Sequence, residues 1–140
     1  MFLIDTNVLS EERKIPGGRA DPNVKSWLSQ LPDGSAYVSV ITLLELERWA
    51  LLRGRRDFAQ GNSLRGWIDD NVSPGFANRI LSIDLTIARR CAALHVPDPR
   101  PQHDALIAAT ALVHGLTVVT RNTSDFAPMG VKLLNPWEPQ

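Results

Sequence analysis

The chain alternates between short apolar runs and longer stretches in which apolar residues recur at helical spacing. Each short run is followed by polar or turn-forming residues, as expected of buried strands that open into helices. The runs predict four strands and a fifth at the sheet edge, over residues 2–4, 36–38, 80–83, 117–120 and 133–134. Because strands that alternate with helices pair in parallel and carry helices on both faces, the pattern predicts one α/β domain over residues 1–140.

The helical stretches lie between these runs, and capping residues mark their ends. Helices are expected over residues 40–53, 85–95 and 103–114, with a shorter helix from residue 22 and an outer helix or helix pair over 53–70. Asp21, Asp84 and Gly115 are typical capping residues for three of these segments. The start of the helix after residue 39 is open by one turn, because both a Ser39 cap and a capping box from Thr42 to Glu45 fit.

The charge balance excludes some classes of nucleic-acid-binding protein. Fifteen acidic and fifteen basic residues give a formal net charge of zero, which is not that of a histone-like protein, a basic arm or an acidic tail. It does not exclude an enzyme that acts on nucleic acid, because the total does not report where the charges lie. Most of the basic residues are Arg, which binds phosphate through two parallel hydrogen bonds.

The single cysteine and the absence of long apolar stretches indicate the compartment. Cys91 cannot form an internal disulfide or a cysteine zinc site. The first residues lack the charged and apolar regions of a signal peptide. No run reaches the ~18 apolar residues of a membrane span. We therefore expect a soluble cytoplasmic protein.

Two carboxylates stand where a buried strand or an apolar helix makes them unusual. Asp5 directly follows the first strand, where it could be either an N-cap or a functional group at the sheet edge. Glu45 lies in a helix rich in Leu, and an unpaired buried carboxylate costs several kcal/mol. Its partner is expected to be either Arg48, one helical turn on, or a divalent cation. Glu47 points to the other side of that helix and is read as structural.

Two further carboxylates follow later in the chain. Asp104 begins an Ala-rich helix, where the macrodipole favours an acid and small residues allow close approach to the sheet. Asp125 lies in the loop after the fourth strand, where turn residues often cap only the local backbone. Singly, each acid is most simply structural. Together, the four are expected at the edge where parallel strands end, and their mutual repulsion then calls for a cation.

The chemistry of such a cluster is specific. Ligands that offer only oxygen favour Mg²⁺ or Mn²⁺ over zinc or copper. A cation held in this way activates water and stabilises in-line attack on a phosphate. His103 could act as a general base beside Asp104, although a solvated loop histidine is the simpler interpretation. Arg53, Arg55 and Arg56 are interpreted as a solvated helix end, with a phosphate-binding patch as the alternative.

Five segments make the sequence resemble a known family. They are residues 3–10 (LIDTNVLS), 40–47 (VITLLELE), 104–112 (DALIAATAL), 117–126 (TVVTRNTSDF) and 134–137 (LNPW). In this order they resemble the PIN-domain ribonucleases of the VapC/FitB type, the toxins of type II toxin–antitoxin systems. Trp49 departs from the pattern, because the family often has a small residue there. Some relatives place the fourth acid at the position of Asn122 rather than Asp125.

The resemblance implies a fold, an activity and partners. The fold would be a three-layer α/β/α sandwich around a mainly parallel sheet of four to five short strands. The activity would be Mg²⁺- or Mn²⁺-dependent endonucleolytic cleavage of RNA by a homodimer that a cognate antitoxin protein inhibits. Asp5 and Asp104 would bind the metal, and Glu45 and Asp125 would complete the acidic site. The supporting residues, which would orient water, ligands or phosphate, are Thr6, Asn7, Thr120 and Asn122.

Two other functions fit parts of the pattern. A haloacid-dehalogenase-like phosphatase also begins with an Asp at a strand end, but it needs a second Asp two residues later, where this chain has Asn7. A catalytically silent PIN scaffold would act only through protein contacts. The presence of Asp5, Glu45, Asp104 and Asp125 together favours the nuclease.

Overall fold

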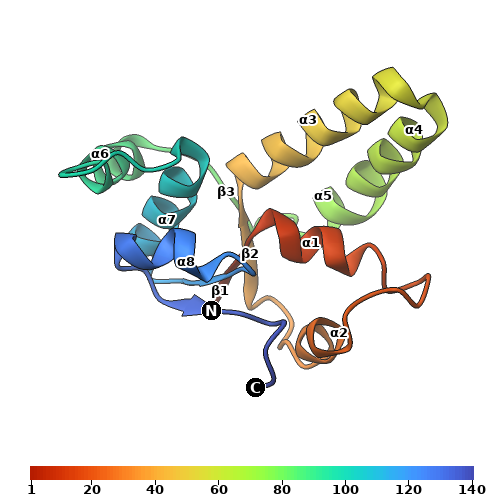
Figure 1. Cartoon of the computed structure of the whole chain (residues 1–140), viewed down its shortest axis with the longest axis horizontal. Coiled ribbons are helices and arrows are strands. Elements are labelled where there is room, and N and C mark those ends of the chain that lie inside the picture. The colour runs from red at the N-terminus through yellow and green to blue at the C-terminus, as the bar shows by residue number, and fades with distance from the viewer.

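Five short strands form a single sheet in the computed structural model, which describes all 140 residues (Figure 1). Their order across the sheet is β3-β2-β1-β4-β5, and their bounds are Phe2–Ile4 (β1), Ala36–Ser39 (β2), Ile80–Leu81 (β3), Thr117–Val119 (β4) and Leu133–Leu134 (β5). All neighbouring pairs are parallel, and Phe2 lies opposite Ala36 on one side and Thr117 on the other. The predicted parallel sheet is confirmed, with β1 at its centre.

The strand ends differ slightly from the predicted ones. β2 includes Ser39, β4 ends at Val119 rather than Thr120, and β3 contains only Ile80 and Leu81 of the predicted residues 80–83. β3 lies at the sheet edge and pairs only with β2, so few backbone hydrogen bonds extend it. Thr120 thus stands one residue beyond β4, at the edge where the strands end.

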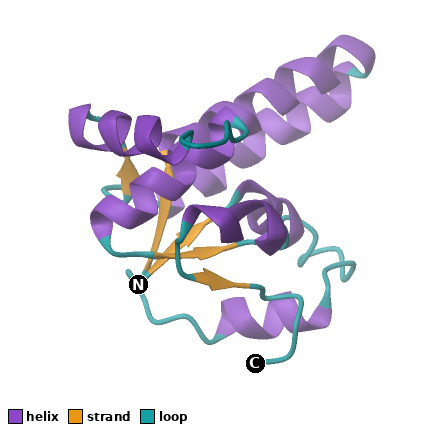
Figure 2. Cartoon of the chain, turned by 60° about the vertical axis from the view of Figure 1, so that its left-hand side comes forward, coloured by secondary structure: helices purple, strands orange, loops and turns teal.

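Helices cover both faces of the sheet and give the expected three layers (Figure 2). One face carries the first four helices, and the other carries the last three. The bounds are α1 (Thr6–Glu12), α2 (Pro22–Ser29), α3 (Val40–Arg56), α4 (Phe58–Trp67), α5 (Ser73–Gly75), α6 (Leu85–Leu94), α7 (Gln102–His114) and α8 (Thr123–Phe126), with a π-helical turn η1 (Ile68–Val72) and a 3₁₀ turn η2 (Ala127–Met129). None of these helices has the length and apolar character needed to cross a bilayer.

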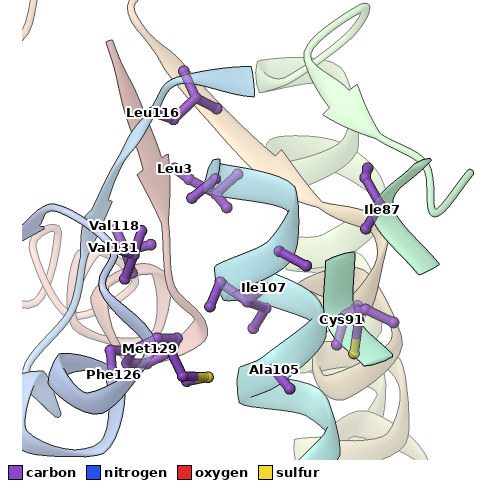
Figure 3. Close-up of a cluster of buried hydrophobic side chains, with 14 residues drawn as sticks. Leu3, Ile87, Cys91, Ala105, Ile107, Leu116, Val118, Phe126, Met129 and Val131 are labelled. Carbon is purple, nitrogen blue, oxygen red and sulfur yellow. The ribbon is translucent and has the colours of Figure 1, made fainter. Parts of the chain in front are cut away.

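Each face of the sheet has its own core because side chains alternate along a strand. Leu3 packs on one face with α6, α7 and α8, where Ile107 and Phe126 are fully buried (Figure 3). Ile4, the next residue of β1, packs on the other face with α1, α2 and α3, where Leu46 is fully buried. The apolar runs of the central strands are therefore buried on both sides, as expected of a parallel sheet.

The predicted helix caps are present. The carboxylate of Asp21 accepts hydrogen bonds from the backbone of α2, that of Asp84 accepts one from α6, and Gly115 ends α7 with a left-handed φ of 68°. Ser39 Oγ accepts a hydrogen bond from the backbone N–H of Ile41, so α3 begins at Val40. The capping box that starts at Thr42 does not form.

The segment after residue 40 forms a long antiparallel hairpin of α3 and α4 that extends away from the sheet (Figure 1). α3 continues to Arg56, beyond the predicted end at residue 53, and α4 confirms the expected outer helix. The two helices approach closely where Gly54 faces Gly61, because a Cβ atom on Gly61 would lie 2.4 Å from Gly54 Cα. Gly54 and Gly61 therefore mark a close helix–helix contact.

Candidate active site

The four predicted acids lie at the edge where the parallel strands end. Asp5 follows β1 directly, and Glu45 is on α3, which follows β2. Asp125 is in the first turn of α8 after β4, and Asp104 is in the first turn of α7. Asp5 and Asp104 lie within electrostatic reach of each other and of Glu45, and Asp104 also of Asp125. The structure thus brings all four together.

Asp5 serves as both a helix cap and a member of the site. Its Oδ1 accepts a hydrogen bond of 2.8 Å from the backbone N–H of Thr6, at the start of α1. Its Oδ2 accepts one of 2.7 Å from the Thr120 hydroxyl, and the residue is only 6% exposed. Burial raises the pKa of Asp5 to about 6, against the two hydrogen bonds, and the charges of Glu45 and Asp104 add to the rise.

Glu45 finds partners other than the predicted Arg48. Its Oε1 accepts a hydrogen bond of 2.7 Å from the Thr6 hydroxyl, and its Oε2 lies 3.4 Å from His103 Nδ1. Arg48, one of the two partners considered from the sequence, is exposed and forms no ion pair with Glu45. Glu45 lies on the side of α3 that faces α1 and α7, whereas Glu47 pairs with Arg65 of α4 at 3.0 Å, which confirms its structural role.

His103 is half-buried rather than solvated, which corrects the simpler interpretation of this histidine. It lies in the first turn of α7 and reaches across to α3, where its contact with Glu45 is made. Its position beside Asp104 in the chain signalled proximity to the site, but nothing in the sequence signalled Glu45 as its partner.

Asp104 is half-buried, and no side chain or backbone group donates a hydrogen bond to its carboxylate. Burial is the main cause that raises its pKa, followed by the charges of Asp125 and Glu45, whereas His103 lowers it. The neighbouring Ala105 and Ala108 are fully buried, which lets α7 lie close to the sheet as predicted. Asp104 is therefore a half-buried carboxylate near other carboxylates, and no Lys or Arg pairs with it.

A histidine that sequence reasoning did not single out fixes the start of α7. His95, just after α6, accepts a hydrogen bond of 3.0 Å at Nδ1 from the backbone N–H of Arg100. Its Nε2 lies 2.7 Å from Oε1 of Gln102, the first residue of α7. Because Nδ1 is an acceptor, the ring proton is on Nε2, and this N–H donates a hydrogen bond to Gln102 Oε1. This imidazole joins α6 to the turn that carries Asp104.

Three of the four predicted supporting residues, Asn7, Thr120 and Asn122, form a network around the Thr120 hydroxyl. While donating to Asp5, Thr120 Oγ1 accepts hydrogen bonds from Asn7 Nδ2 at 3.3 Å and from the backbone N–H of Asn122 at 3.0 Å. Thr6 holds Glu45 in the same way. Asn122 contributes its backbone rather than its side chain, which is exposed. The side chain of Asn7, which stands where a haloacid-dehalogenase-like phosphatase needs its second Asp, belongs to this hydrogen-bond network.

The donor set suits a divalent cation. All four candidate ligands are carboxylates; burial raises the pKa of Asp5 and Asp104 most, and the charges of the neighbouring acids add to the rise, a repulsion that a cation relieves. No three His, Cys, Asp or Glu side chains of the chain are close enough to enclose an ion in this arrangement. Binding would therefore have to draw the side chains together, and Asp125, which is exposed, has the most freedom to move.

The Arg53, Arg55 and Arg56 group lies at the far end of the helical hairpin, away from the acids (Figure 1). All three side chains are exposed and lie in the last turn of α3, where the helix dipole favours cations. Their position supports the interpretation as a solvated helix end.

Comparison with known proteins assigns the chain to a family. The PIN-domain family model matches residues 2–131. The VapC ribonuclease Y4jK of Sinorhizobium fredii is 37% identical, with 99% of each chain covered. Toxin FitB of Neisseria gonorrhoeae is 37% identical over 98% of this chain and 99% of its own. The crystal structure of FitAcB from Neisseria gonorrhoeae matches with a TM-score of 0.88 and 34% identity over 99% of each chain.

These matches extend over nearly the whole chain and exclude the haloacid-dehalogenase-like phosphatase as an alternative. The sheet order, the position of the acids and the relatives agree, and the protein belongs to the PIN-domain family, in the branch of the VapC and FitB proteins.

Proposed function

We propose that this protein is a Mg²⁺- or Mn²⁺-dependent endoribonuclease and the toxin of a type II toxin–antitoxin system, acting on RNA in the cytoplasm. The observation that carries the proposal is the meeting of Asp5, Glu45, Asp104 and Asp125 at one sheet edge without a Lys or Arg paired to any of them. The relatives named a VapC ribonuclease and a toxin support it.

The chain's own residues would prepare the site in three ways. Asp5 and Asp104, supplemented by Glu45 and Asp125, would hold the cation, which when bound acidifies water and stabilises charge on the phosphate. Thr120 and Thr6 fix the orientation of Asp5 and Glu45 before anything binds, so the movement that encloses a cation would fall mainly on the other two carboxylates. Because Asp5 is buried, its carboxylate is withdrawn from water and favours a cation over solvent.

Cleavage of structured RNA by the purified protein, with Mg²⁺ and then with EDTA, tests the activity. Asp5→Asn or Asp104→Asn is expected to abolish cleavage while circular dichroism shows an intact fold. Glu47→Gln is the matched control, because Glu47 is an acid of the same helix as Glu45 that pairs with Arg65 instead. Undiminished cleavage by both Asn variants would overturn the assignment of the site, and folded protein that cleaves nothing would favour a silent scaffold.

The antitoxin is expected to insert an apolar segment that carries an Arg near the acids. A solved structure titled a toxin–antitoxin complex, from Klebsiella pneumoniae, is 31% identical to this chain with a TM-score of 0.67, which supports a protein partner here. Co-expression with the product of the adjacent reading frame should inhibit cleavage, and the lack of such a partner would favour a housekeeping nuclease.

A homodimer is proposed through the helix starts that follow β2 and β3. Val40 and Leu44 of α3 are 38% and 46% exposed, and Leu85 at the start of α6 is 67% exposed. Because β2 and β3 are parallel neighbours, these apolar side chains emerge at the same edge of the sheet. Leu44→Glu combined with Leu85→Glu should convert a dimer into a monomer in light scattering, whereas a wild-type monomer would overturn this part of the proposal.

A further inference from the structure

Arg121 lies in the chain between Thr120 and Asn122, two residues of the hydrogen-bond network around the site. Its backbone N–H donates a hydrogen bond of 3.3 Å to Asn7 Oδ1, and the preceding Thr120 bonds to Asp5. The backbone N–H of Thr120 in turn donates to Leu134 O at 3.0 Å, at the end of β5. The main chain at Arg121 is therefore held at the same sheet edge as the four acids.

The side chain of Arg121 is held over an anchored aromatic ring. Its guanidinium carbon lies 5.1 Å from the centroid of the Trp137 ring, which is within the range of a cation–π contact. Trp137 is fixed at both backbone ends, because its N–H donates to Asn135 Oδ1 at 2.9 Å and its carbonyl accepts from Asn23 Nδ2 at 2.8 Å. The cation is thus positioned in advance by the chain that leaves β5.

The guanidinium itself is exposed and unpaired. No carboxylate lies within 4.0 Å of it, and no protein oxygen accepts from its N–H groups. Glu11 is within its electrostatic reach, but that carboxylate already accepts 3.0 Å and 2.7 Å hydrogen bonds from Lys14 and from the backbone of Asp21. All five N–H donors of Arg121 are therefore available to a ligand.

We propose that Arg121, positioned by Trp137, binds a backbone phosphate of the RNA beside the one that enters the acidic site; this inference rests on the proposed function. A cation among the four carboxylates can offset the charge of one phosphate, but the next phosphate along the strand meets no such ion. A guanidinium offers that phosphate two parallel hydrogen bonds. Arg121 would then act on substrate affinity and on register, not on the chemical step.

Steady-state cleavage at several salt concentrations tests the inference. Arg121→Gln is expected to raise KM about tenfold with kcat within about twofold, and to reduce the slope of log KM against log salt by about one. Arg121→Lys should keep the slope while raising KM by less. Arg55→Gln is the matched control, because it removes an exposed Arg at the far end of the hairpin and should change neither quantity.

A purely structural role gives a different result. If Arg121 only covers Trp137, Arg121→Gln lowers the melting temperature and leaves the salt slope unchanged, which would overturn the inference. Trp137→Phe should retain most of the affinity because the ring remains, whereas Trp137→Leu should raise KM about threefold through loss of the cation–π contact. Wild-type protein that neither binds nor cleaves RNA would overturn the proposed function as well, whereas active wild type with an unchanged Arg121→Gln variant would overturn only this inference.

Discussion

The hydroxyl of Thr120 donates a hydrogen bond of 2.7 Å to Oδ2 of Asp5 and so joins the end of β4 to the end of β1. Both residues are buried, and 115 positions separate them in the chain. The bond stabilises the ionised form of Asp5 against the burial that disfavours it. The bond therefore links two strands at the sheet edge and also favours the charged form of Asp5.

Thr120→Val should therefore weaken activity at neutral pH. The variant removes the donor but keeps the shape, so the pKa of Asp5 rises above its present value of about 6. A hydrogen bond to a charged group is worth ~1.5–3 kcal/mol, or about one to two pKa units. We expect cleavage at pH 7 to fall about two- to tenfold and to recover at higher pH, as measured by a pH–rate profile. Thr120→Ser keeps the hydroxyl, and a profile for it that matched the Val variant would contradict the explanation.

The raised pKa of Asp5 also links the stability of the metal-free protein to pH. The native protein takes up a proton near pH 6 and the unfolded chain only near 3.8, so between these values the native state binds more protons. The stability from this group is complete below pH 3.8 and is lost as pH rises through about 6, with a total of about 3 kcal/mol. Asp104, whose pKa is also raised, acts in the same direction.

Urea unfolding in EDTA from pH 4 to pH 7.5 measures this effect. Other groups titrate as well, so the relevant quantity is the difference in unfolding free energy between the wild type and Asp5→Asn. This difference should shift against the wild type as pH rises, and added Mg²⁺ at pH 7 should restore wild-type stability. A difference that stays constant across the range would show that Asp5 is not the linked group.

Much of the site could be predicted because parallel strands end at a common edge. Asp5 and Asp125 follow strands β1 and β4, which turned out to be neighbours, so their convergence needed only the order of elements along the chain. The contacts that hold the first turn of α7, which carries Asp104, could not be predicted in this way. Its fixation by His95, Arg100 and Gln102 depends on how a loop folds back on α6, and no periodic pattern encodes that return.

The partners of Glu45 and the helical hairpin show a second limit. A carboxylate in an apolar helix indicated that a partner must exist, and the sequence offered Arg48 or a divalent cation; the protein partners instead come from α1 and α7. The contact between Gly54 and Gly61 has no signal in the sequence. Their role is visible only once α4 folds back on α3 and Gly61 meets Gly54.

Gly61→Ala should destabilise the protein although it places a better helix former in α4. The added Cβ would lie 2.4 Å from Gly54 Cα and 2.8 Å from its nitrogen, and both are backbone atoms that cannot turn away. Overpacking of this kind costs ~1–3 kcal/mol. Gly66→Ala in the same helix is the control, because nothing lies closer than 4.0 Å to its new Cβ and Ala gains up to about 1 kcal/mol over Gly. Urea unfolding should move in opposite directions for the two variants, and equal shifts would refute the close contact.

Mn²⁺ binding measurements can show whether Asp125 or Asn122 is the fourth ligand of the proposed metal site. Asp125 has an exposed carboxylate that raises the pKa of Asp104 by repulsion, so it lies close enough to approach a shared cation. Asn122 acts through its backbone N–H on Thr120, which an Ala residue retains. We therefore expect Asp125→Asn to weaken Mn²⁺ binding in calorimetry by about tenfold or more, since loss of a charged ligand outweighs the lower pKa of Asp104. Asn122→Ala should bind Mn²⁺ within about twofold of the wild type, because no ligand or charge is removed. The reverse ranking would assign the fourth position to the Asn122 side chain and leave Asp125 as an acid that acts only at a distance.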